Sequence, residues 1–222
     1  MDSSRVSTGS PALDDLLGGG LERRTITQVY GEPGCGKSTL CLLAAVAVLA
    51  EGLPVVYIDS EGFSADRFRQ IAGDAAESCA DRLFLFEPET FDQQAIMIGE
   101  CEAIVRSRHA GLIVLDSVTA LYRSEMLPGG EVQRRLGHQL VRLLGYAKRF
   151  DIPVLVTNQV YMDIDRGVVK GLGGTTLRHI SKAIVRIEKR NGSRRAVLEK
   201  HRSLPEEGAF EFEIVKEGIK RL

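Results

Sequence analysis

The sequence has few cysteines and lacks any Cys-X-X-Cys pair. Its four cysteines, Cys35, Cys41, Cys79 and Cys101, are scattered along 222 residues. This spacing argues against a zinc site and against a disulfide framework. Unpaired cysteines are typical of a reducing compartment, so we expect a cytoplasmic protein.

Long apolar runs and a large net charge are also missing. The longest apolar run, LCLLAAVAVLA, has 11 residues, which is too short to span a bilayer. The first fifteen residues contain no apolar segment of the kind found in signal peptides. Because the formal net charge is −1, any nucleic-acid binding must depend on locally clustered cations. With no internal repeat and no long linker, we expect one domain over residues 1–222.

The order of apolar segments predicts an α/β fold. Short apolar strands are expected at 25–30, 54–59, 83–87, 112–116 and 153–159, separated by helices at 36–51, 64–78, 92–108 and 132–150. Such alternation indicates a mostly parallel sheet covered by helices on both faces. After residue 159 the pattern changes to strands at 183–188 and 195–200 around an Asn-Gly turn, followed by 210–215, which indicates an antiparallel C-terminal edge.

A complete phosphate-binding motif follows the first of these strands. GEPGCGKS at Gly31–Ser38 fits the pattern G-x-x-x-x-G-K-[ST] and lies between a predicted strand and a predicted helix. The glycines allow backbone N–H groups to surround phosphates, and the helix N-terminus adds a favourable dipole. Lys37 supplies a charge beside the outer phosphates. We therefore expect ATP to be bound by Gly31, Glu32, Pro33, Gly34, Cys35, Gly36, Lys37, Ser38 and Thr39.

Two further strand ends carry residues suited to nucleotide chemistry. LIVLD ends in Asp116, which is expected to hold Mg²⁺ through water, opposite the Ser38 hydroxyl. Glu61, just after the strand PVVYID, is the candidate for orienting the attacking water, with Asp59 as the nearby alternative. Gln159, after PVLVTN, is expected to respond to the γ-phosphate.

These segments together resemble the RecA/RadA recombinase core. VSTGSPALDDLLGGGLERRTITQVYGEPGCGKST, VVYIDSEG, LIVLDSVTALYR, VTNQV and GLGGTTLRHISKAIVRIEKR occur in the family's order and cover essentially the whole chain. RadA-type recombinases also carry an N-terminal helix-hairpin-helix domain and a linker with a phenylalanine–alanine polymerisation motif, and we expect neither here. The EKHR at Glu199–Arg202 is similar to a short, core-only archaeal paralogue of the family.

The resemblance implies an accessory role in homologous recombination and DNA repair. It implies ATP and Mg²⁺ as cofactors, very weak ATPase activity and no strand exchange. It implies single-stranded or branched DNA as a partner, together with the main RadA-type recombinase and a Holliday-junction resolvase. The expected protein is a nucleoid-associated monomer or small homo-oligomer with no membrane attachment.

A basic segment near the C-terminus is the main candidate for DNA binding. Residues 178–202 contain nine Lys and Arg residues against two glutamates, a local balance of +7 in a chain of net charge −1. That asymmetry favours a DNA-facing edge, although charges that merely block edge pairing of strands remain an alternative. The candidate residues here are Arg178, Lys182, Arg186, Lys189, Arg190, Arg194 and Arg195.

Two loops occupy the family's DNA-loop positions. The segment 123–130 contributes Arg123, and the segment 161–174 contributes Arg166 and Lys170. Tyr161 could stack on a base or pack against the core. Lys200 and Arg202 could instead reach the ATP of a neighbouring subunit, as basic residues do in RecA-type assemblies, which would require an oligomer.

Two other functions remain open at this point. The same fold serves active DNA-dependent ATPases and recombinases, and it serves KaiC-like signalling ATPases that bind no DNA. The basic segment favours a DNA-binding protein over the signalling class. The expected absence of the polymerisation motif favours an accessory protein over a recombinase.

Overall fold

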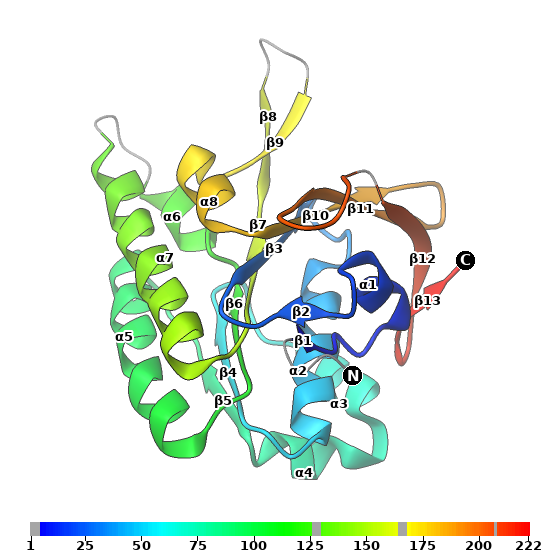
Figure 1. The fold of residues 1–222 in the computed structure, drawn as a ribbon, viewed down its shortest axis with the longest axis horizontal. Coiled ribbons are helices and arrows are strands. Elements are labelled where there is room, and N and C mark those ends of the chain that lie inside the picture. Colours follow the sequence, from blue (N-terminus) through cyan, green and yellow to red (C-terminus); the bar gives the residue numbers. More distant parts are fainter. Residues whose placement is uncertain (1–4, 126–129, 164–167, 207) are drawn as a thin grey trace.

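The structure is a computed structural model that describes residues 5–125, 130–163, 168–206 and 208–222. A nine-stranded sheet forms its centre, in the order β13-β12-β11-β10-β3-β7-β6-β4-β5 (Figure 1). Its strands are β3 (Ile26–Gly31), β4 (Val55–Asp59), β5 (Leu83–Phe86), β6 (Leu112–Asp116), β7 (Val154–Asn158), β10 (Ala183–Lys189), β11 (Arg194–His201), β12 (Ala209–Val215) and β13 (Gly218–Arg221).

Parallel and antiparallel pairing divide this sheet into two parts. From β10 to β5 every neighbouring pair is parallel. From β10 outward to β13 every pair is antiparallel. The sequence therefore correctly predicts the mostly parallel sheet with antiparallel C-terminal strands.

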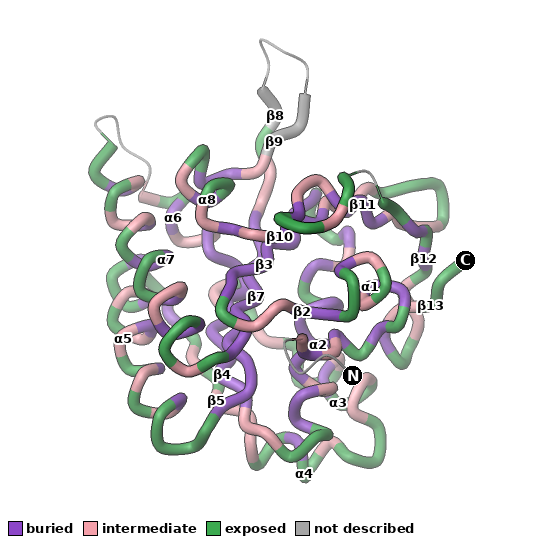
Figure 2. Tube along the Cα trace, viewed as in Figure 1, coloured by how far each residue is buried: buried purple, intermediate pink, exposed green. Residues whose placement is uncertain are grey.

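Helices cover both faces of the parallel part (Figure 1). One apolar core lies between the sheet and α1 (Pro11–Leu16), α2 (Lys37–Ala50), α3 (Ala65–Ala72) and α4 (Ala76–Ala80). The other lies between the sheet and α5 (Phe91–Arg108), α6 (Ala120–Ser124), α7 (Glu131–Phe150) and α8 (Gly174–Ile180). Because both faces are covered, β3, β4, β6 and β7 are buried along their whole length, as the purple centre of Figure 2 shows. No helix of the described residues is long and apolar enough to cross a membrane.

Several elements differ from the sequence-based expectation. The helix expected at 64–78 is broken, because α3 ends at Gly73, whose φ is +55°, and a 3₁₀ turn, Gly73–Ala75, precedes α4. Three elements built from two- to four-residue strands were not predicted. They are the pair β1 (Arg5–Val6) with β2 (Leu21–Glu22), the last strand β13, and a hairpin of β8 (Val160–Asp163) with β9 (Val168–Gly171). The β8–β9 hairpin projects from the body of the molecule (Figure 1).

The close contact between Gly20 and strand β1 can be tested by substitution. Gly20 has a φ of +116°, and a Cβ built on it would lie 2.3 Å from the carbonyl oxygen of Val6. Gly20→Ala should therefore lower the free energy of unfolding by about 2–4 kcal/mol. Gly145→Ala is the matched control, because this α7 glycine has no atom within 4 Å of its Cβ position, and it should raise stability by up to about 1 kcal/mol. Urea denaturation measures both, and equal effects of the two substitutions would contradict the packing described.

Candidate nucleotide-binding site and basic hairpin

The predicted nucleotide-binding residues meet at one edge of the sheet. Parallel strands present their carboxyl ends on the same side, which is where ligands bind in open α/β sheets. The P-loop follows β3, Asp59 ends β4, Asp116 ends β6, and Gln159 follows β7. Asp59 and Asp116 are also direct partners in the register of β4 with β6. The residues that the sequence singled out at separate strand ends are therefore brought together.

The backbone of the P-loop has a shape that only glycine accommodates at three positions. Gly34 and Gly36 have φ values of +71° and +105°. A Cβ on Gly31 would lie 2.4 Å from the carbonyl oxygen of Ile187 and 2.8 Å from the Cys35 sulfur. The helix α2 then begins at Lys37. This compact turn leading into a helix N-terminus is the arrangement that binds phosphate through backbone N–H groups.

Lys37 is held inside the loop. Its side chain is buried, and Nζ donates hydrogen bonds to the carbonyl oxygens of Gly31 at 3.0 Å and Glu32 at 3.1 Å. These two carbonyl partners hold the ammonium group beside the loop. A phosphate bound within the loop would meet that charge directly.

Asp116 is the most enclosed acidic group of the site. It is 1% exposed and accepts hydrogen bonds from the Tyr57 hydroxyl at 3.1 Å and from the Thr157 hydroxyl. Burial raises the pKa of Asp116, while hydrogen bonds from Thr157 and Ser38 act in the opposite direction. The Ser38 hydroxyl and the Asp116 carboxylate therefore lie together as an all-oxygen pair, which suits Mg²⁺.

Tyr57 and Thr157 are site residues that the sequence analysis missed. Each lies inside a buried strand, Tyr57 in VVYID and Thr157 in VLVTN. A polar group on a buried strand needs a partner, and this is the signal by which the two residues could have been found. Their partner, Asp116, is on a neighbouring strand in each case.

The two carboxylates after β4 have different surroundings. Asp59 is 5% exposed, and its Oδ1 accepts the backbone N–H groups of Glu61 at 2.9 Å and Gly62 at 2.6 Å. Asp59 thus closes the turn. Glu61 is exposed, and its Oε1 accepts a hydrogen bond from Gln159 Nε2 at 2.8 Å. The candidate for orienting water and the candidate γ-phosphate sensor are therefore in direct contact.

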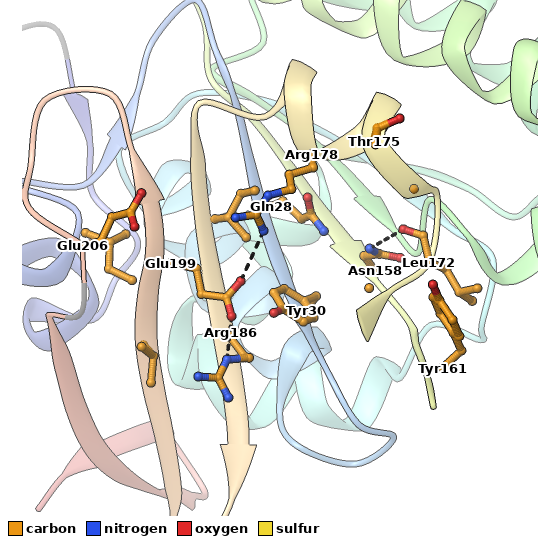
Figure 3. A pocket seen from close by; sticks show the side chains of 15 residues that line it. Gln28, Tyr30, Asn158, Tyr161, Leu172, Thr175, Arg178, Arg186, Glu199 and Glu206 are labelled. Atoms are coloured by element: carbon orange, nitrogen blue, oxygen red, sulfur yellow. Dashed lines mark hydrogen bonds and ion pairs between the residues drawn. The ribbon is translucent and has the colours of Figure 1, made fainter. Parts of the chain in front are cut away.

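The basic residues near the C-terminus lie on α8, β10, β11 and their turn, and many of them are paired. Glu199 lies between Arg178 at 3.7 Å and Arg186 at 2.7 Å (Figure 3). Glu188 is paired with Arg186, with Arg190 at 2.8 Å and with Arg195 at 4.0 Å. Two glutamates therefore offset much of the positive charge that sequence counting assigns to this hairpin.

A cavity of about 720 Å³ lies next to this charge network (Figure 3). Tyr30, Arg178, Arg186 and Glu199 contribute to its wall. Burial and the hydrogen bond to Glu199 raise the pKa of Tyr30, so its hydroxyl stays protonated at neutral pH. The cavity is separate from the Asp59–Asp116 pair, and its polar groups are largely satisfied by one another.

The remaining basic candidates have varied positions. Arg123 is exposed near the end of α6, and Lys182 lies in the connection between α8 and β10. Arg166 lies outside the described residues, and Lys170 lies on β9 in a stretch without described side chains. Tyr161, at the foot of the β8–β9 hairpin, is 44% exposed.

Lys200 and Arg202 both have partners within the chain. Lys200 Nζ donates to the carbonyl oxygens of Arg178 and Ser181, each at 2.7 Å, which caps the end of α8. Arg202 pairs with Glu22. Contact with a neighbouring subunit's nucleotide would require both side chains to leave these partners.

Comparison with known proteins places this fold and site in a family. The Rad51 family profile matches residues 2–222. The chain therefore belongs to the Rad51 family.

Within that family the chain is similar to the archaeal RadB proteins. It is 60% identical over 222 residues to the DNA repair and recombination protein RadB of Methanoculleus marisnigri, covering 99% of each chain. It is 42% identical to the protein of the same name from Archaeoglobus fulgidus, again over 99% of each chain. A crystal structure of the RadB recombinase superimposes with a TM-score of 0.84 at 40% identity, covering 98% of this chain and 99% of the other. The resemblance inferred from the motifs is thus confirmed.

The environment of Asp59 predicts a pH dependence of stability. Burial raises the pKa of Asp59 to about 6, whereas an unfolded aspartate has a pKa of about 4. The folded state binds this proton more tightly, so the stabilisation is complete below about pH 4 and is lost as the pH rises through 6. Asp59→Asn, which keeps an acceptor for the two N–H groups, should therefore be more stable than the wild type at pH 7.5 by about 2 kcal/mol.

The measurement is urea denaturation of both proteins between pH 4 and 7.5. The difference in the free energy of unfolding should grow with pH and level off above the pKa of Asp59. Asp116 is present in both proteins, and its charge contributes to the raised pKa of Asp59. A difference that does not change with pH would contradict the raised pKa.

Proposed function

We propose that this protein is an ATP- and DNA-binding accessory factor of homologous recombination and DNA repair, with very weak ATPase activity and no strand exchange of its own. The observation that carries the proposal is the P-loop, with Asp116 and Glu61 on neighbouring strand ends. The names of its relatives, DNA repair and recombination protein RadB, support the biological role.

ATP would be held by the P-loop and Mg²⁺ by a pair of oxygen ligands. Backbone N–H groups of the P-loop, except at Pro33, and the Lys37 ammonium would face the phosphates. Ser38 would ligate the metal directly, and Asp116 would hold it through water. When bound, Mg²⁺ neutralises charge on the outer phosphates. The pKa of Asp116, raised by burial, is lowered again by a nearby cation, so metal binding and ionisation of Asp116 favour each other.

Slow turnover is consistent with the surroundings of Glu61. This carboxylate is exposed and accepts the Gln159 amide at 2.8 Å. This contact occupies an oxygen of the carboxylate that would orient the attacking water. Gln159 Nε2 has a second N–H that could donate to a γ-phosphate, and such a contact would couple the nucleotide to Glu61 and to the residues that follow β7.

DNA would bind along the outer face of the β10–β11 hairpin and the loops near it. The proposed contacts are Arg123, Arg166, Lys170, Arg178, Lys182, Arg186, Arg190 and Arg195. The two other candidates from the sequence, Lys189 and Arg194, lie on the opposite face of the hairpin. DNA phosphates would compete with Glu188 and Glu199 for the paired arginines. Each such exchange weakens binding relative to free cations, so we expect moderate affinity with strong salt dependence. The DNA would be single-stranded or branched.

The proposed role in recombination also suggests protein partners. A RadA-type recombinase and a Holliday-junction resolvase are the proposed partners, and the protein itself would be a monomer or a small homo-oligomer. The alternatives are an active DNA-dependent recombinase, which requires fast DNA-stimulated turnover, and a signalling ATPase, which requires no DNA binding.

The first test titrates single-stranded DNA with and without ATP and Mg²⁺. We expect the nucleotide to change the dissociation constant for DNA by about fivefold or more. Lys37→Ala should lower ATP affinity by roughly 10- to 100-fold, since it removes a charge-assisted phosphate contact, and should abolish the nucleotide effect on DNA. Lys148→Ala, an exposed lysine of α7, is the control and should behave as the wild type. Absence of DNA binding at low salt would refute the proposed function.

A second test addresses Glu61. Glu61→Gln should lower the rate of phosphate release at least about tenfold, while ATP affinity stays within about twofold because the residue lies outside the phosphate cradle. Single-turnover phosphate release and calorimetric ATP titration measure the two quantities. Glu51→Gln, an exposed glutamate after α2, serves as the control. Wild-type turnover in the Glu61 variant would exclude this residue as the water-orienting group.

A further inference from the structure

Two of the cations assigned to DNA lie on the P-loop side of the sheet. Side chains alternate between faces along a strand. On β10, Val185 and Ile187 belong to the apolar core around α2, so Lys189 lies on the same face. On β11, Ala196 and Leu198 belong to that core, so Arg194 shares it as well.

Lys189 and Arg194 are also direct cross-strand partners. The next pair along the ladder is Glu188 with Arg195, which places opposite charges together on the other face. Like charges that face each other across two strands are unfavourable. An anion between or beside Lys189 and Arg194 would therefore stabilise the pair.

Within the described residues, no carboxylate supplies that anion. Neither Lys189 nor Arg194 makes a side-chain hydrogen bond or an ion pair there, whereas Arg186, Arg190 and Arg195 all pair with Glu188. The Nε atom of Arg194 is buried and has no hydrogen-bond partner in the same part of the chain. A buried, unpartnered donor of a charged group is costly unless a ligand completes it.

The P-loop lies beside this pair. Lys189 Nζ is 3.4 Å from the position that a Cβ on Gly34 would occupy. Arg194 is paired in register with Phe212 of β12, and the Phe212 ring comes within 3.9 Å of the Cβ position of Gly36. The positive charge of Lys189 also opposes the effect of burial, which raises the pKa of Cys35 within the loop. Both strands that carry the cations thus border the phosphate cradle.

We propose that Lys189 and Arg194 form a cation pair that contacts the phosphate chain of the nucleotide held by the P-loop. The inference rests on the proposed nucleotide binding and adds to it two ligands from the basic hairpin. The opposite face of the same hairpin carries Arg186 and Arg195. Phosphate contact with one face therefore fixes the position of the cations on the other, which links nucleotide occupancy to the DNA-binding surface.

The test is a calorimetric titration of ATP with Mg²⁺ at low salt. Lys189→Gln and Arg194→Gln should each raise the dissociation constant for ATP by about 5- to 10-fold, as expected for the loss of one charge-assisted contact. Tripolyphosphate, used as a competitor without a base, should lose affinity by a similar factor. Lys148→Gln, an exposed lysine of α7 that lies in neither proposed binding surface, is the matched control and should keep the wild-type ATP affinity.

The outcomes separate this inference from the proposed function. If the wild type binds ATP and Lys37→Ala does not, but the Lys189 and Arg194 variants bind ATP as tightly as the wild type, the inference is refuted and the function stands. Losses for ATP without losses for tripolyphosphate would also refute it, because the contact would then be with the nucleoside. If the wild type binds no ATP, both proposals fail. Thermal unfolding of each variant verifies that the hairpin substitutions leave the fold intact.

Discussion

The parallel pairing of β3 with β7 on one side and with β10 on the other determines what surrounds the phosphate loop. Through β7 the loop shares its edge of the sheet with Asp116 and Gln159. Through β10 it touches the first strand of the antiparallel, basic part of the chain. The carbonyl oxygen of Ile187 leaves no room for a side chain on Gly31. One strand therefore connects the chemistry of hydrolysis with the surface proposed for DNA.

Charge is distributed unequally along that edge. On the β4–β6 side, Asp59 and Asp116 are buried, and burial raises the pKa of both carboxyls. On the β10–β11 side, Lys189 and Arg194 face the loop without carboxylate partners among the described residues. Two acids on one flank suit a divalent cation, and two bases on the other suit a phosphate chain. A magnesium nucleotide has both kinds of group, and it would offset unfavourable electrostatics on both flanks at once.

Much of this arrangement could be predicted from the sequence because strand periodicity and the P-loop are local signals. The strands of the parallel sheet begin and end within one or two residues of the expected positions, and Asp116, Glu61 and Gln159 do lie at strand ends. The face of each hairpin cation could not be predicted, because it depends on the register of β10 with β11 and on a bulge between Ile184 and Val185. The same register pairs several of the arginines with Glu188 and Glu199, so a count of charges over residues 178–202 overstates the free positive charge. The break at Gly73 and the short strands β1, β2 and β13 depend on tertiary contacts that leave little trace in periodicity.

The central claim is that a nucleotide in the P-loop acts on the β10–β11 hairpin. Amide hydrogen exchange measured with and without ATP and Mg²⁺ tests this most directly. The account predicts slower exchange both in residues 31–38 and in the turn 190–193 that joins β10 to β11, with an unchanged rate at the far end of α7. Slower exchange confined to residues 31–38, with the hairpin turn unaffected by the nucleotide, would contradict it.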